Sequence, residues 1–69
     1  MTDQDMIDSS RALVVALMQI SDSKGFGVED RVAFACMALP EFIAQQIGPV
    51  AMIERLRNVA DVMERQFLN

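Results

Sequence analysis

The apolar residues of this 69-residue chain recur at intervals of three and four, and nowhere do they alternate with polar residues over the length of a strand. Intervals of three and four place side chains on one face of an α-helix, whereas a strand requires a period of two. The sequence therefore predicts an all-α fold, a small bundle of about four helices at residues 3–22, 28–38, 41–47 and 50–67. No repeat, linker or low-complexity segment interrupts the chain, so we expect residues 1–69 to form a single helical domain.

Capping residues, glycine and proline set the helix boundaries in this prediction. Thr2 followed by Asp5 is typical of a helix start, because the hydroxyl can accept a bond from a first-turn amide and an acid favours the positive end of the helix dipole. Lys24 and Gly25 are typical of the end of the first helix. Pro40 has no amide hydrogen and restrains the preceding residue, so we expect the second helix to break there, with a kink as the alternative.

The chain is poor in reactive side chains, since it has no histidine, tyrosine or tryptophan and only one cysteine, Cys36. That cysteine lies in the apolar run 32–39, so we expect it to be buried and inert. The segment 22–27 begins with an acid and has glycine in sixth place, as a calcium loop does, but Lys24 and Phe26 occupy places that require oxygen ligands. We therefore expect no catalytic residue, no metal site and no cofactor, and a protein that is not an enzyme.

Charge and hydropathy limit the partners of the chain. Ten acidic and six basic residues give a net charge of −4, which disfavours nonspecific binding to nucleic acid or to anionic lipid. The longest uncharged run, residues 42–53, is shorter than the roughly 18 apolar residues of a membrane span. Acids precede the first basic residue, where a signal peptide would carry positive charge. The sequence predicts a cytoplasmic protein with no membrane partner, and no small-molecule substrate is evident.

The small size of the chain favours self-association. For a mass of 7.7 kDa, folding removes roughly 7,000 Å² of surface from water. If about 60% of that surface is apolar, its burial contributes on the order of 100 kcal/mol. Ordering the residues costs nearly as much, at about 1.5 kcal/mol each. Because a lone cysteine cannot form an internal disulfide, we expect the stability margin to come from packing and association, most simply as a symmetric dimer.

The clearest amphipathic pattern follows Gly48 and Pro49, in the predicted helix 50–67. Its apolar residues repeat with a 3-4-3-4 spacing, and we expect them to form the shared surface of a helical homodimer: Ile53, Leu56, Ala60, Met63 and Phe67. A second protein is a further candidate partner for such a chain. The sequence thus predicts a non-enzymatic protein–protein interaction or regulatory module, such as a small acidic adaptor or inhibitor.

An alternative function is suggested by the segment 42–57. It contains Ile43-Ala44-Gln45-Gln46-Ile47-Gly48 followed by Met52-Ile53-Glu54-Arg55-Leu56-Arg57. These residues resemble the helix-turn-helix of repressor-like DNA-binding domains, in which an alanine-bearing first helix ends at a glycine. The resemblance covers about 16 residues and implies a transcriptional regulator whose second helix enters the major groove. Arg55 and Arg57 would then be the DNA-facing residues.

Overall fold

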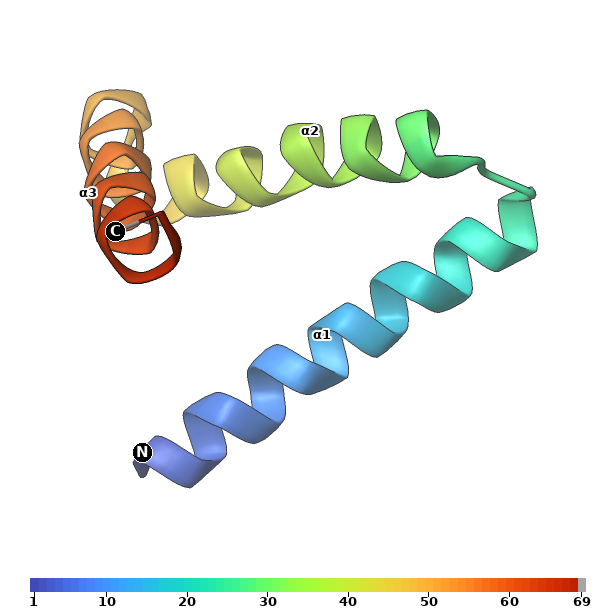
Figure 1. Ribbon diagram of the computed structural model, residues 1–69, viewed down its shortest axis with the longest axis horizontal. Helices are drawn as coiled ribbons and strands as arrows, with labels where there is room; N and C mark the ends of the chain where they lie inside the picture. The colour runs from blue at the N-terminus through green and yellow to red at the C-terminus, as the bar shows by residue number, and fades with distance from the viewer. Residues whose placement is uncertain (69) are drawn as a thin grey trace. The chain divides into compact units, whose positions relative to one another are not determined.

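The computed structural model describes residues 1–68 and places three helices in them: α1 (Asp3–Lys24), α2 (Val28–Ile47) and α3 (Pro49–Phe67) (Figure 1). Residues 1–68 contain no strand, so the prediction of an all-α chain is confirmed. The prediction of four helices, two long and two short, is wrong, because the three helices have similar lengths of 22, 20 and 19 residues. The chain divides into two compact units, Met1–Ala35 and Cys36–Asn69.

Helix α1 begins at a capping box. The Thr2 hydroxyl accepts a hydrogen bond from the Asp5 amide at 3.1 Å, and the Asp5 carboxylate accepts one from the Thr2 amide, also at 3.1 Å. Each bond satisfies an amide that has no partner within the helix. The bond from the Thr2 amide lowers the pKa of Asp5, and the bond between the two side chains acts in the same direction. The predicted role of Thr2 as the N-cap is confirmed.

The same helix ends at Gly25, which has φ 68° and ψ 30°. The Gly25 amide donates to the Asp22 carbonyl at 3.2 Å, and the Phe26 amide donates to the Ser21 carbonyl at 2.9 Å. These two bonds define a Schellman motif, which requires a left-handed residue that glycine adopts at little cost. The stop predicted from Lys24 and Gly25 is confirmed, although the helix extends two residues beyond the predicted end.

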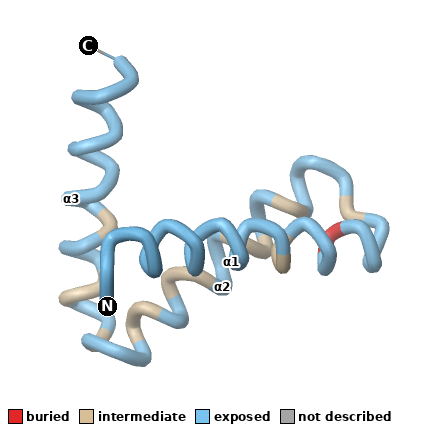
Figure 2. Tube along the Cα trace, turned by 90° about the horizontal axis from the view of Figure 1, so that it is seen from below, coloured by how far each residue is buried: buried red, intermediate tan, exposed pale blue. Residues whose placement is uncertain are grey.

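Helix α2 begins shortly after this turn, and an aromatic contact joins the helix to the residues that precede it. The ring of Phe26, between the helices, lies 5.6 Å from the ring of Phe34 in α2, with the planes tilted by 56°. Offset and tilted ring pairs of this kind are favourable. Ser21 on α1 is the one residue among 1–68 that is buried, with 2% of its surface exposed (Figure 2). Its hydroxyl donates to the Leu17 carbonyl at 2.7 Å, so the buried polar group is satisfied.

Pro40 lies inside α2, so the predicted break after residue 38 is wrong. The missing amide hydrogen of Pro40 removes one hydrogen bond, the one that the Cys36 carbonyl would accept. Ending the helix would instead leave up to four carbonyls and then four amides without helical partners. One lost hydrogen bond in a continuous helix therefore costs less free energy than two additional helix ends. The residues on either side of Pro40 also favour the helix, since they include strong helix formers such as Met37 and Glu41.

A single residue, Gly48, separates α2 from α3. Its amide donates to the Ala44 carbonyl at 2.8 Å, and its carbonyl accepts from the Met52 amide at 3.0 Å, so Gly48 closes one helix and opens the next. Its φ of 88° and ψ of 162° lie in a region that is essentially restricted to glycine. Pro49 then occupies the first turn of α3, where no amide donor is needed. The predicted boundary at Gly48 and Pro49 is confirmed.

The described residues contain no buried apolar side chain. Several are half-buried, among them Phe34, Leu39 and Ile43 in α2. Cys36 is exposed, so the expectation of a buried cysteine is wrong. The run 32–39 is apolar, but successive side chains of a helix point in different directions, so only some of them face other residues. In this run Phe34, Ala35 and Leu39 are half-buried and Cys36 is exposed.

Candidate functional site

The five residues predicted to form a dimer interface lie along one stripe of α3. We call this stripe the α3 seam, and it consists of Ile53, Leu56, Ala60, Met63 and Phe67. Residues three and four apart on a helix lie on the same face, so the 3-4-3-4 spacing gives a continuous apolar strip nearly parallel to the helix axis. Within the seam, Leu56 is half-buried, whereas Met63 and Phe67 have exposed fractions of 53% and 76%.

The two halves of α3 differ in burial, because half-buried residues occur only in the N-terminal half. The half-buried residues of this helix are Ala51, Met52 and Leu56, all in its first three turns, and every residue from Arg57 to Leu68 is exposed (Figure 2). Within the unit Cys36–Asn69, the C-terminal half of α3 therefore exposes its large apolar side chains, Met63 and Phe67 among them. Contiguous exposed apolar surface is characteristic of interaction sites, whereas isolated apolar residues on a surface are normal.

The exposed half of the seam is hollowed. An open, shallow cavity of about 400 Å³ is lined by Ala60, Met63, Glu64, Phe67 and Leu68. Ala60 contributes the smallest side chain of the seam, and the large side chains of Met63 and Phe67 flank it. A depression between large apolar side chains can accept the side chain of an opposing helix, as in knobs-into-holes packing. Glu64 is the one charged group at this hollow.

The two arginines predicted as DNA-facing residues in the alternative function, Arg55 and Arg57, are both exposed on α3. They are two residues apart, and a helix rotates by about 100° per residue, so their side chains leave the helix in nearly opposite directions. The structure does not bring them to one face. The corner before them is one residue long, Gly48, whereas the turn of a helix-turn-helix has three or four residues.

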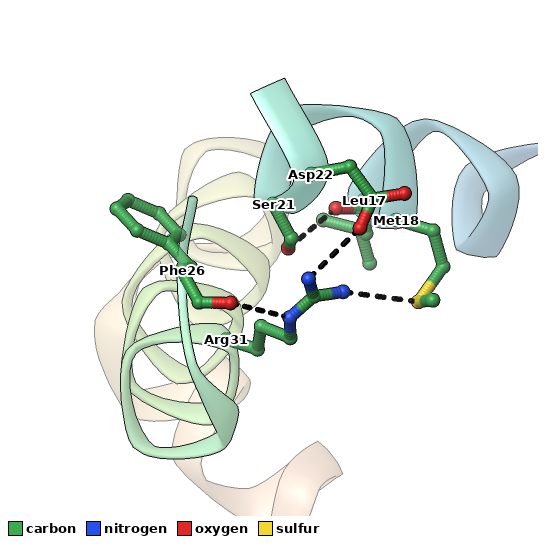
Figure 3. A network of polar contacts seen from close by, with 6 residues as sticks. All are labelled: Leu17, Met18, Ser21, Asp22, Phe26 and Arg31. Carbon is green, nitrogen blue, oxygen red and sulfur yellow. Dashed lines mark hydrogen bonds and ion pairs between the residues drawn. The ribbon is translucent and has the colours of Figure 1, made fainter. Parts of the chain in front are cut away.

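A cluster of polar contacts joins α1 to the start of α2, and sequence reasoning did not identify it (Figure 3). The Arg31 side chain donates from Nη2 to Asp22 Oδ1 at 2.8 Å and from Nε to the Phe26 carbonyl at 2.8 Å. Its Nη1 lies 3.9 Å from Met18 Sδ. These contacts join the end of α1, the turn and the start of α2, so we assign the cluster to stabilising the turn between the helices.

The N-terminal helix α1 also exposes apolar residues. Met6, Leu13 and Ile20 are exposed, and Leu17, between them on the same face, is half-buried. Unlike the α3 seam, this face includes polar residues, and Ser10 donates its hydroxyl to the Met6 carbonyl at 2.9 Å. The apolar face of α1 is thus weaker as an interaction surface than that of α3.

Groups suited to metal binding do not gather in residues 1–68, since no three histidine, cysteine, aspartate or glutamate side chains lie close enough to hold an ion. None of the helices in this part of the chain combines the length and apolar character that crossing a membrane requires. The feature with the most distinct geometry in the described chain is therefore the apolar seam of α3.

Comparisons with protein families, with curated proteins and with solved structures gave no significant match to this chain.

Proposed function

We propose that this protein is a non-enzymatic protein–protein interaction module that acts as a helical homodimer through α3, in the manner of a small adaptor, inhibitor or regulatory subunit. The observation that carries the proposal is the α3 seam, whose C-terminal residues Met63 and Phe67 are large, apolar and more than half exposed. An amphipathic helix gains stability when its apolar stripe is covered by another helix.

The size of the chain supports the proposal. At 69 residues the chain lies in the range in which a single hydrophobic core rarely supplies more than a few kcal/mol, and small domains add disulfides, metals or oligomerisation. The one cysteine, Cys36, is not in a disulfide within the chain. Oligomerisation remains as the source of additional buried apolar surface, and a closed dimer is the commonest form.

Substitution in the seam tests the proposal. Met63→Asp places a charge in the proposed interface at a side chain that is exposed in the single chain, so the monomer should keep its helix content while the dimer dissociates. Leu56→Asp changes a half-buried residue and is expected to dissociate or unfold the protein. Light scattering coupled to size exclusion gives the mass, and circular dichroism gives the helix content. A dimer that persists in Met63→Asp at unchanged affinity would rule out α3 as the shared surface.

DNA binding through residues 42–57 is the alternative that the same protein preparation can test. The chain has a net charge of −4, and a protein that neutralises few phosphates gains little affinity from counterion release. The interaction-module proposal therefore predicts no retention on a heparin or DNA column at physiological salt. Salt-dependent retention that is lost in Arg55→Glu and Arg57→Glu would favour the regulator instead.

A further inference from the structure

The two flanks of the α3 seam differ in charge. On one flank lie Arg57 and Glu64, which are seven residues apart and so occupy the same position in successive heptads. On the other flank lie Met52, Val59 and Gln66, which carry no charge. Residues seven apart are too distant for a contact within one helix, where neighbours are three or four apart. Among residues 1–68 the ion pair that forms is that of Arg31 with Asp22, so neither Arg57 nor Glu64 is paired there and both are available to a second helix.

A parallel pair of α3 helices leaves these charges without partners. In a parallel coiled coil, one flank of each helix faces the opposite flank of the other. Arg57 would then face the partner's Met52, and Glu64 would face the partner's Val59. Neither charged group would gain an opposite charge from the partner, so this flank would not favour the parallel arrangement.

An antiparallel pair brings the same flank of both copies together, and two alignments use four of the five seam residues. The first places Ile53 opposite the partner's Met63 and sets Arg57 against the partner's Arg57, a repulsive arrangement. The second places Leu56 opposite the partner's Phe67 and Ala60 opposite the partner's Met63. In that alignment Arg57 faces the partner's Glu64, and the two-fold symmetry forms this pair twice.

Resting on the proposed homodimer, we infer that two copies of α3 associate antiparallel in this second alignment, with Arg57 paired to the partner's Glu64. Exposure agrees with the inference, since the two alignments share Leu56, Ala60 and Met63, and the second adds Phe67, which is 76% exposed, where the first adds Ile53, which is 45% exposed. The hollow agrees too, because Glu64 lines it beside Met63 and Phe67. The partner's Leu56 and the aliphatic stem of its Arg57 would lie over that hollow.

A charge-reversal cycle tests the orientation. The dissociation constant of the dimer is measured by sedimentation equilibrium at low salt for the unmodified protein, Arg57→Glu, Glu64→Arg and the double variant. Each single reversal places like charges opposite each other twice, and we expect it to weaken the dimer on the order of tenfold. The double variant restores opposite charges and should return to within about threefold of the unmodified protein.

Three comparisons keep the outcome unambiguous. Arg55→Glu makes the same change of charge on α3 away from the seam and should leave the dissociation constant within about twofold. Circular dichroism identifies any charge reversal that unfolds the chain. In that case the cycle is repeated with the neutral substitutions Arg57→Gln and Glu64→Gln in place of the reversals. Raising the salt concentration should reduce the coupling between the two positions, because exposed charges are screened.

The failure of this inference differs from the failure of the proposed function. A stable dimer in which Glu64→Arg has no effect, or in which the double variant is as weak as the two single effects combined, would overturn the antiparallel alignment and leave the homodimer intact. An unmodified protein that is monomeric at every concentration would overturn both.

Discussion

Arg31 of α2 donates from Nη2 to Asp22 Oδ1 of α1 at 2.8 Å, across the turn that joins the two helices. The same guanidinium donates from Nε to the Phe26 carbonyl, which belongs to the turn itself. One side chain therefore ties the end of α1, the turn and the start of α2 together. Asp22 and Arg31 are nine positions apart in the sequence, and they lie on different helices, so no helical periodicity relates them.

Replacement of Arg31 should loosen this turn. Arg31→Ala removes the ion pair and the bond to the Phe26 carbonyl, and we expect the free energy of unfolding to fall by about 1 kcal/mol, because Asp22 is largely exposed and exposed pairs contribute little. Urea denaturation followed by circular dichroism measures the change. Arg55→Ala, at an exposed arginine on α3, is the matched control, and an equal effect of both substitutions would show that the turn contacts contribute nothing.

The conformation of Gly48 should make it intolerant of any side chain. Gly48→Ala is expected to lower the free energy of unfolding by about 1–3 kcal/mol, since its φ of 88° and ψ of 162° are unfavourable for alanine. Space is not the cause, because an added Cβ would meet no atom within 4 Å. Gly27→Ala also meets no atom within 4 Å, and its φ is not in the left-handed range, so thermal denaturation should show little loss there. A loss at Gly27 as large as at Gly48 would argue against the backbone explanation.

The capping box makes the stability of α1 depend on pH in the acidic range. The hydrogen bonds from Thr2 lower the pKa of Asp5 below its ordinary value of 3.8. The stabilisation from the ionised carboxylate is therefore fully present above pH 3.8, and it is lost as the pH falls through the lower pKa of the folded state. Amide chemical shifts of Thr2 and Asp5 followed by NMR should titrate below pH 3.8. Thr2→Ala removes the hydroxyl but keeps the amide of residue 2, so the midpoint should rise only in part, and an unchanged midpoint would show that the hydroxyl does not contribute to the shift.

Pro40 should cost α2 part of its stability. Pro40→Ala restores an amide that can donate to the Cys36 carbonyl, and we expect a gain of about 1–3 kcal/mol in the free energy of unfolding. Pro49→Ala is the control, because a proline in the first turn of a helix lacks nothing that the helix needs. Urea denaturation of both variants provides the measurement. Greater stabilisation at residue 49 than at residue 40 would contradict the role assigned to Pro40.

The local signals in the sequence predicted most helix boundaries, and the misjudged boundary has a physical explanation. Thr2, Gly25 and Gly48 act on their immediate neighbours, so their effects are readable from a few residues. Pro40 disfavours a helix at one position, but the continuation of α2 depends on the total cost of two additional helix ends. A prediction based on one residue overlooks that comparison.

The candidate site could be predicted only as a stripe. The 3-4-3-4 spacing in α3 identified the seam residues, and the structure places all five on one helix. The sequence could not show that the half-buried residues of α3 end at Leu56, because burial depends on which segments pack together. For the same reason Cys36 was expected to be buried, and the pairing of Arg31 with Asp22 was missed.

Self-association of the unmodified chain is the central claim, and sedimentation equilibrium over a concentration series from about 1 to 200 µM tests it most directly. A homodimer should give a mass near twice 7.7 kDa at the upper concentrations, and this mass should decline toward 7.7 kDa on dilution. A mass of 7.7 kDa throughout the series, with the helices intact by circular dichroism, would contradict it.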